Sequence, residues 1–386
     1  MKRVKAWLVV LAVGVSLAAP AYAVPTTPAP VPDAIPVALL VDLSTGQQLY
    51  AREPARRFVP ASVTKVMTAY TAFKLVGEGK LKLDRHFLYT QGLEDEWYAE
   101  GSNMFLRAGQ RPTIGQLLLG ITTVSGNDAS MALAEAATGS TGAWLDLMNE
   151  NATALGMTDS HFGSPNGYPD GGKTYTTAED LVKLGRAVTQ DYPGLFHRFF
   201  GHRRLTWGDI TQANHDPITG QVDGGDGLKT GFTSEAGYTL LGTAERGGRR
   251  LVVVLAGAPT GRMRDQTGRN LIEWGFRDFA PTRLFAAGAE LGSAQVQDGI
   301  VKSVGLALDG DFAAALPADP ESTMHLAISY RGPVQAPIAK GDPIARLQLQ
   351  DASGTVVLDA PLVATEDVAK AGLFRRIGNA FAKWFG

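Results

Sequence analysis

The chain has 386 residues, of which 45% are hydrophobic and 19% are charged, so it is long enough for a large core and two or three domains. Its formal net charge of −2 provides no basic field for nucleic acid, and no nucleic-acid partner is expected. Because the chain contains no cysteine, disulfides, thiolate metal sites and a cysteine nucleophile are excluded.

Residues 1–23 are predicted to be a signal peptide. Positive residues lie within positions 1–5, an apolar run follows over 7–19, and positions 21–23 form a small-x-small cleavage pattern. The apolar run is short for a membrane-spanning helix, although an uncleaved anchor is the alternative. The proline-rich residues 24–36 are predicted to be an extended leader without a packed core.

Residues 37–279 are predicted to form one α+β domain. The run at 37–42, the turn at 44–46 and the run at 47–51 predict a β-hairpin. Strand patterns return at 238–244 and 251–256, so the early and late strands are expected to share one sheet. The helices predicted between them are 64–76, 114–124, 129–138 and 143–155.

Residues 280–366 are predicted to form a second, β-rich domain. The composition changes near residues 279–281, and short strand-like runs then alternate with Gly and Pro turns, as in a small sandwich. These runs are 295–297, 302–308, 324–330, 344–349 and 356–358.

Residues 367–386 predict an amphipathic helix that binds a membrane surface through residues 368–386. At 100° per residue, large apolar side chains fill one arc of about 120°, and Arg375, Arg376 and Lys383 lie opposite. A basic face opposite an aromatic face is typical of an interfacial helix, whereas a helix docked on its own protein is the alternative. The apolar arc contains Leu373, Phe374, Ile377, Phe381, Trp384 and Phe385.

Three short motifs occur in order: Ser62-Val63-Thr64-Lys65, Ser125-Gly126-Asn127 and Lys229-Thr230-Gly231. Each is weak alone, since Ser62 could be only a helix cap, but together in fitting contexts they favour catalysis. Ser62 and Lys65 lie three residues apart at a predicted helix start, so they face the same side. A serine hydroxyl needs a base, and a lysine serves only when burial or a second cation, such as Lys229, lowers its pKa.

The other two motifs are candidates for contacts with a substrate. A loop between two predicted helices could present Ser125 to a leaving nitrogen and Asn127 to a carbonyl. Gly231 could let a substrate lie along a strand edge by β-augmentation. Backbone N–H groups near Phe232 and at Ser62 could form an oxyanion hole.

These motifs resemble those of the penicillin-interacting serine enzymes, in particular the low-molecular-mass penicillin-binding proteins that are D-alanyl-D-alanine carboxypeptidases. The likeness covers nearly the whole chain after residue 23. It implies a β-lactamase/transpeptidase-like catalytic domain, with a five-stranded antiparallel sheet, helices and a helical lobe, then a β-rich domain and a C-terminal membrane helix. Further matching segments are 41–46, 165–167, 226–231, 236–238 and 274–276.

Carried over by position, the resemblance implies Ser62 as the acylated nucleophile, Lys65 as its base, and Ser125 with Lys229 as a proton-relay pair. Physical chemistry supports a clamp on the terminal carboxylate, because a guanidinium such as Arg264 can form two parallel hydrogen bonds with it. The alternative for Arg264 is a surface charge. The predicted substrate-binding residues are Asn127, Thr230, Gly231, Phe232, Arg264 and His215.

One segment departs from the family pattern. The family often has Asn-Arg-Asn upstream of the third motif, where this chain has Asn214-His215-Asp216. A histidine lacks the reach and the fixed charge of an arginine, so substrate affinity or preference could differ.

The implied function is a serine D,D-carboxypeptidase that removes the terminal D-Ala from peptidoglycan stem pentapeptides through a Ser62 acyl-enzyme. β-Lactams are expected to inhibit it, no metal or cofactor is expected, and its expected location is the periplasmic face of the inner membrane. A D,D-endopeptidase on cross-linked peptidoglycan shares the motifs. A β-lactamase is disfavoured because residues 163–172 contain no Glu, and a non-catalytic wall-binding protein because the motifs are intact.

Overall fold

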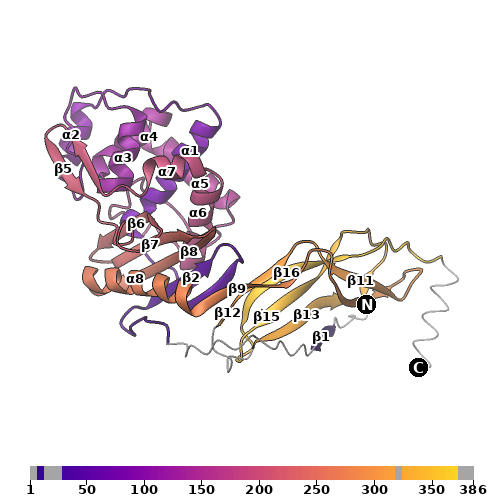
Figure 1. The fold of residues 1–386 in the computed structure, drawn as a ribbon. Helices are drawn as coiled ribbons and strands as arrows, with labels where there is room; N and C mark the ends of the chain where they lie inside the picture. Colours follow the sequence, from indigo (N-terminus) through magenta and orange to yellow (C-terminus); the bar gives the residue numbers. More distant parts are fainter. Residues whose placement is uncertain (1–6, 13–27, 318–323, 373–386) are drawn as a thin grey trace. The chain divides into compact units, whose positions relative to one another are not determined.

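The computed structural model describes residues 7–12, 28–317 and 324–372, which group into two compact units (Figure 1). Within the described chain, the larger unit holds residues 28–44 and 48–277. The smaller unit holds residues 7–12, 45–47, 278–317 and 324–372.

A five-stranded antiparallel sheet lies at the centre of the larger unit, in the order β3-β2-β8-β7-β6. As predicted, the early hairpin joins the late strands, because β2 pairs with β8 along its whole length. Helices cover both faces (Figure 1). Gly185 of α6 (Ala178–Gln190) lies near Val252, whereas Gly275 of α8 (Gly261–Asp278) lies near Leu251, whose side chain points to the other face of the strand. The strands are β2 Val37–Asp42, β3 Gln47–Arg52, β6 Gly225–Thr233, β7 Gly237–Arg246 and β8 Arg249–Ala258.

The helical lobe confirms the four predicted helices. The second of them, α3, has the predicted bounds because its ends are specified locally: Thr113 and Gln116 form a capping box, and Ser125 ends the helix in the left-handed conformation. Three further helices of the lobe, and α8 beyond β8, were not predicted. The elements are η1 Ala61–Thr64, α1 Lys65–Gly77, α2 Gln91–Trp97, α3 Ile114–Val124, α4 Asn127–Thr138, α5 Thr141–Ala154, α6 Ala178–Gln190, α7 Pro193–Phe199, β4 Arg204–Trp207, β5 Ile210–Ala213 and α8 Gly261–Asp278.

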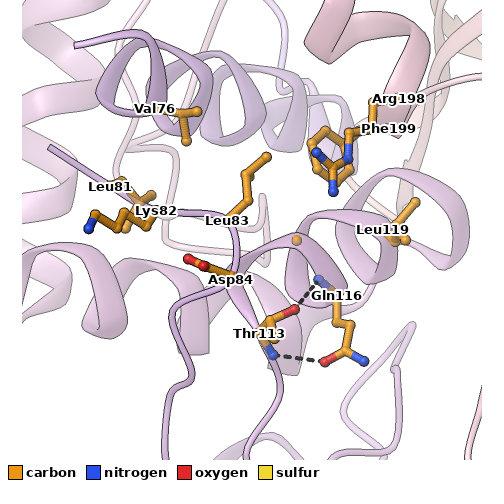
Figure 2. Close-up of a pocket in the computed structure, with 11 residues that line it drawn as sticks. Val76, Leu81, Lys82, Leu83, Asp84, Thr113, Gln116, Leu119, Arg198 and Phe199 are labelled. Atoms are coloured by element: carbon orange, nitrogen blue, oxygen red, sulfur yellow. Dashed lines mark hydrogen bonds between the residues drawn. The ribbon is translucent and has the colours of Figure 1, made fainter. Parts of the chain in front are cut away.

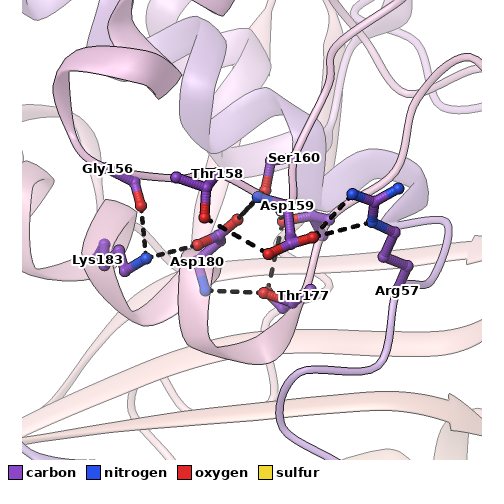
Figure 3. A network of polar contacts seen from close by, with 9 residues as sticks. Arg57, Gly156, Thr158, Asp159, Ser160, Thr177, Asp180 and Lys183 are labelled. Carbon is purple, nitrogen blue, oxygen red and sulfur yellow. Dashed lines mark hydrogen bonds and ion pairs between the residues drawn. The ribbon is translucent and has the colours of Figure 1, made fainter. Parts of the chain in front are cut away.

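A polar network ties the segment before Asn166 to the start of α6 (Figure 3). The Asp180 carboxylate accepts hydrogen bonds from the Asp159 N–H (2.9 Å) and the Ser160 hydroxyl (2.8 Å). Arg57 donates to Asp159 and Lys183 donates to Asp180, each over 2.8 Å. The network fixes the path of the chain toward residues 164–167, which reach the active-site region.

The smaller unit is β-rich, as predicted, with a seven-stranded sheet in the order β1-β13-β15-β16-β11-β10-β14 and a separate β9–β12 pair. Alternate residues of β15, Ala345, Leu347 and Leu349, are buried, as expected for a strand with one face on a core. The strands are β1 Trp7–Ala12, β9 Phe279–Phe285, β10 Glu290–Gln297, β11 Ser303–Leu308, β12 Phe312–Pro317, β13 His325–Gly332, β14 Val334–Gln335, β15 Pro343–Gln350 and β16 Val356–Ala364.

Residues 28–36 of the proline-rich leader, which was predicted to be extended and without a packed core, pack against the rest of the larger unit. Ile35 is fully buried, at 0% exposure. The Arg52 guanidinium donates to the carbonyls of Pro32 (2.6 Å) and Ile35 (3.0 Å). A side-chain donor thus satisfies backbone acceptors in a segment whose prolines lack N–H groups. Residues 24–27 lie outside the described residues.

Within the predicted signal peptide, only residues 7–12 are described, and they lie in the fold rather than outside it. They form β1, which pairs antiparallel with β13, so that Val9 is opposite Tyr330. An open strand edge accepts an extended segment through backbone hydrogen bonds, and here that segment is the apolar run.

The predicted C-terminal helix does not begin at residue 367. Val368, which is 1% exposed, exchanges backbone hydrogen bonds with Ile338 over 2.8 and 3.0 Å, and the Ala371 N–H donates to the Asp298 carbonyl. Residues 368–371 are therefore part of the smaller unit, because these backbone bonds fix them in an extended conformation. Residues 373–386 lie outside the described part of the chain. Among the described helices, none is both long and apolar enough to cross a bilayer.

Candidate active site

A cavity of about 590 Å³ brings the three motifs together. The nine predicted residues that line it come from all three motifs, from the segment after β5 and from α8: Ser62, Ser125, Asn127, His215, Lys229, Thr230, Gly231, Phe232 and Arg264. Lys65 is the exception, because it lies buried beside Ser62 and does not line the cavity.

The turn that carries Ser62 is a 3₁₀ helix, η1, which continues directly into α1. Residues three apart are nearly eclipsed in a 3₁₀ turn, so Lys65 Nζ lies 3.0 Å from Ser62 Oγ. The same nitrogen donates to Asn127 Oδ1 (2.8 Å) and to the Asn166 carbonyl (2.6 Å). The side chain is therefore fixed at three points and is only 1% exposed.

Burial lowers the pKa of Lys65 well below its ordinary value, and the positive charge of Lys229 lowers it further, as predicted. Asp128 opposes these two effects. A neutral amine has two N–H groups, which match the acceptors on Asn127 and Asn166, and one lone pair. That lone pair is available to the Ser62 hydroxyl, so the geometry suits a general base.

Burial also lowers the pKa of Lys229, to about 7. Asp216 acts against this shift, whereas Arg264 adds to it. Lys229 Nζ donates to the Thr230 carbonyl over 2.8 Å. Lys229 therefore changes its charge close to neutral pH, as a residue that exchanges protons must do.

Ser125 and Asn127 are held at the junction of α3 and α4. Ser125 has φ 61°, a strained left-handed conformation for a residue with a side chain. Its buried Oγ has no hydrogen-bond partner among the described residues, so it is available to a ligand in the cavity. Asn127 Nδ2 donates to the Glu100 carbonyl over 2.8 Å and carries a second N–H for a substrate.

Sequence reasoning assigned no role to two positioning residues, although one of them, Asn166, lies in the matching segment 165–167. Asp128, which is fully buried, accepts hydrogen bonds from the N–H groups of Met104 (2.9 Å), Leu106 (3.0 Å) and Ala129 (2.8 Å). It joins the first turn of α4 to the loop that supplies the opposite wall of the cavity. The available signal was an acidic residue at a helix start. The second residue, Asn166, acts through its backbone carbonyl, which a side-chain motif does not reveal.

Strand β6 lies against the nucleophile turn, and Gly231 makes this approach possible. A Cβ atom at position 231 would lie 2.6 Å from the Pro60 carbonyl oxygen, 3.0 Å from the Ser62 nitrogen and 2.4 Å from Thr239 Oγ1. Thr239 itself donates to the Pro60 carbonyl over 3.0 Å, which ties β7 to the same turn. The backbone of Ser62 is thus beside β6, an edge strand of the described sheet.

Arg264 is buried in the first turns of α8 and already has an anionic partner. Its Nε donates to Asp265 Oδ1 over 2.8 Å, and its Nη2 lies 2.7 Å from the same oxygen. Its guanidinium carbon is 5.7 Å from the centre of the Tyr238 ring, which packs against Phe232 at a tilt of 31° with centroids 4.3 Å apart. Sequence reasoning missed Asp265, and it named Tyr238 only as part of the matching segment 236–238, without a role.

A larger cavity, of about 700 Å³, lies in the helical lobe and is lined by no motif residue (Figure 2). Thr113 and Gln116 bond to each other there as the cap of α3. The smaller cavity is the candidate active site because it is lined by Ser62, by the buried Lys229 and by Ser125, whose Oγ has no partner among the described residues.

Comparison with known proteins identifies the family of each part. Residues 27–260 match the family model described as D-alanyl-D-alanine carboxypeptidase, and residues 279–370 match the C-terminal domain of penicillin-binding protein 5. The D-alanyl-D-alanine carboxypeptidase DacD of Salmonella typhimurium is 33% identical over 92% of this chain and 92% of the relative. DacA of Escherichia coli is 31% identical over 90% of this chain and 88% of the relative.

Solved structures agree with this assignment. Penicillin-binding protein 5 from Haemophilus influenzae has a TM-score of 0.73 at 28% identity, covering 88% of this chain and 99% of that structure. Penicillin-binding protein D2 from Listeria monocytogenes, solved in its ampicillin-bound form, has a TM-score of 0.57 at 27% identity, covering 63% of this chain and 98% of that structure. The chain belongs to the D-alanyl-D-alanine carboxypeptidase family of serine hydrolases and has the C-terminal domain of penicillin-binding protein 5.

Proposed function

We propose that this enzyme removes the terminal D-Ala from peptidoglycan stem pentapeptides by acyl transfer to Ser62. The observation that carries the proposal is the environment of Lys65. Its two acceptors, Asn127 Oδ1 and the Asn166 carbonyl, account for both N–H groups of a neutral amine and leave the lone pair facing Ser62 Oγ at 3.0 Å.

In the first half-reaction, Ser62 Oγ attacks the carbonyl carbon of the penultimate D-Ala, and Lys65 takes the hydroxyl proton. The backbone N–H groups of Ser62 and Phe232 stabilise the oxyanion. When the intermediate collapses, the peptide C–N bond breaks and an ester to Ser62 remains. The leaving amine receives a proton from Ser125, which Lys229 supplies with a proton in turn. The proton that Lys65 took from Ser62 then passes to Lys229, so Lys65 is neutral again before water enters. Asn127 binds the carbonyl of the substrate backbone.

In the second half-reaction, water attacks the ester carbonyl and Lys65 takes a proton from that water. The C–O bond to Ser62 breaks, and the serine recovers its proton from Lys65. The shortened peptide leaves with a new carboxylate. A β-lactam would enter by the same first step, but its leaving group stays attached, so the ester would persist.

We propose that Thr230 and Arg264 bind the free carboxylate of the substrate. Both line the cavity next to Gly231, where an extended peptide could add to the edge of β6. This pair would favour a terminal D-Ala over an internal bond, which distinguishes a carboxypeptidase from an endopeptidase.

The test is to incubate the chain without residues 1–23 with a pentapeptide ending in D-Ala-D-Ala, with a cross-linked peptide dimer and with a labelled penicillin. We expect stoichiometric D-Ala release, slow cleavage of the dimer and long-lived labelling by penicillin. Preferential cleavage of the dimer would favour an endopeptidase, whereas rapid turnover of penicillin would favour a β-lactamase.

We also propose that the enzyme is exported by residues 1–23 and is peripheral at the periplasmic face of the inner membrane. The sequence of residues 373–386 supports this, because one arc carries large apolar side chains and the other carries Arg375, Arg376 and Lys383. Cations at the centre of a spanning helix would each cost about 2.5–3.5 kcal/mol, so a helix lying in the interface is favoured.

A further inference from the structure

Three basic side chains from different parts of the chain line the cavity at the proposed carboxylate subsite. Lys229 lies on β6, Arg264 lies on α8, and His215 lies in the segment between β5 and β6. Lys229 and Arg264 are buried, whereas His215 is exposed toward solvent. An incoming carboxylate would therefore meet the imidazole together with the two buried cations.

The backbone around His215 is fixed on both sides. Asn214 Nδ2 donates to the His202 carbonyl over 2.8 Å, and the Asp216 N–H donates to Asn214 Oδ1 over 2.9 Å. Asp216 in turn accepts hydrogen bonds from the N–H groups of Ile218 (3.0 Å) and Thr219 (3.1 Å). The imidazole is thus carried on an ordered turn, which keeps it at the cavity wall.

Arg264 and Lys229 together contribute less than two full positive charges to the cavity. Arg264 bonds Asp265 through both Nε and Nη2. Lys229 has a pKa of about 7, so it is charged only part of the time at neutral pH. A third positive charge on this wall would therefore change the attraction for a carboxylate substantially.

The surroundings of His215 favour its neutral form, and a bound carboxylate would favour the charged form instead. Partial desolvation lowers its pKa, and Lys229 and Arg264 lower it further, while Asp265 opposes them. The nearby Asp216 already accepts two backbone N–H groups. An anion bound among these groups would favour the imidazolium, and by linkage the imidazolium would favour the anion.

We infer that His215 is a specificity-determining residue whose protonation strengthens binding of substrates with a free terminal carboxylate. The inference rests on the proposed function, because it requires the carboxylate of the substrate to lie beside Arg264. At mildly acidic pH the enzyme would select more strongly for terminal D-Ala-D-Ala than at neutral pH.

The test compares kcat/KM for a peptide ending in D-Ala-D-Ala with kcat/KM for its C-terminal amide, between pH 5 and 8.5. The ratio of the two values cancels proton transfers that both substrates need. For the wild-type enzyme, we expect the ratio to rise about three- to tenfold on acidification. His215→Gln should lose this rise. His215→Arg should have a high ratio at every pH, because its charge is fixed.

Lys229 also titrates in this range, so the comparison with His215→Gln is decisive. If that variant keeps the full acid rise, the effect belongs to Lys229 and the inference is wrong. His86→Gln is the matched control, since His86 does not line the cavity, and it should behave like the wild type.

An independent readout is the pKa of His215, followed by NMR with and without a bound penicillin that carries a carboxylate. It should rise on binding, and an unchanged pKa would contradict the inference. If neither peptide is cleaved and no penicillin binds, the proposed function itself fails. Cleavage with a flat ratio overturns only the assignment of His215.

Discussion

Lys65 is buried beside Ser62 and Lys229 is buried in the cavity wall, and their surroundings suit them to different steps. Lys65 faces two fixed acceptors, which suit a neutral amine that takes a proton. Lys229 donates to the Thr230 carbonyl and has a pKa of about 7, which suits a residue that both gains and loses a proton. At the scale of single residues, burial sets the direction of both pKa shifts.

The lowered pKa of Lys229 predicts how stability depends on pH. Between pH 7 and 10, the unfolded chain binds a proton at this position that the folded chain does not bind, because the pKa falls from 10.5 to about 7 on folding. Stability contributed by this group therefore rises with pH across that window. In thermal denaturation at several pH values, Lys229→Gln should flatten the rise in melting temperature relative to the wild type. The exposed Lys80→Gln should leave it unchanged, and identical slopes for all three proteins would contradict the buried state of Lys229.

Arg264 predicts a difference between two substrates. Arg264→Ala should lower kcat/KM about tenfold to a hundredfold on a peptide with a free carboxylate, because a hydrogen bond to a charged group contributes about 1.5–3 kcal/mol. The C-terminal amide should be affected much less. Arg262→Ala, which changes an exposed neighbour outside the cavity, is the control. An equal loss on both substrates would mean that Arg264 is structural.

At the scale of elements, the site depends on the contact between η1 and β6. The 3₁₀ turn brings Lys65 under Ser62, and the bare backbone at Gly231 lets β6 reach the Ser62 N–H. The shape of the oxyanion hole therefore depends on the absence of a side chain at one position of β6.

Gly231→Ala should consequently separate β6 from the nucleophile turn. The added methyl group would lie 2.6 Å from the Pro60 carbonyl oxygen, which cannot rotate away as a side chain would. We expect acylation by penicillin to slow about 10²–10³-fold, the loss associated with one oxyanion-hole donor. Gly142→Ala in α5 has open space around it and should leave the rate unchanged. Normal acylation in Gly231→Ala would show that the contact is dispensable.

Elements with local signals were predictable, and those whose burial depends on the rest of the fold were not. The start of α3 coincides with a local signal, the capping box formed by Thr113 and Gln116. By contrast, α8 has a largely polar sequence, and it packs on the sheet through close approaches at Gly268 and Gly275. Such approaches are set by tertiary structure, so the sequence pattern alone did not reveal that helix.

At the scale of the whole molecule, the residues proposed for catalysis and substrate binding all lie before position 265, in the larger unit. The three motifs were sufficient to predict which side chains meet in the cavity. Asp128, Asn166 and Asp265 were not predicted, because they act by holding other groups. The limits proposed for the signal peptide and for the domains stay predictions.

This separation predicts that the C-terminal segment affects membrane binding but not chemistry. Deletion of residues 373–386 should abolish sedimentation with anionic vesicles, while cleavage of a soluble peptide stays nearly unchanged. Binding of the full chain should weaken with added salt, because each cation near an anionic surface contributes about 1 kcal/mol. Replacement of Arg375, Arg376 and Lys383 by Gln should weaken binding in the same direction. Equal sedimentation of the full and shortened chains would place the anchor elsewhere.

The most direct test of the account is to locate the covalent adduct formed with a labelled penicillin. Peptide mapping by mass spectrometry should find the label on Ser62 alone, in a 1:1 ratio with the protein. Ser62→Ala should abolish labelling without loss of thermal stability, and Ser125→Ala should slow labelling while leaving it on Ser62. An adduct on any other residue, or labelling that persists in Ser62→Ala, would contradict the assignment of Ser62 as the nucleophile.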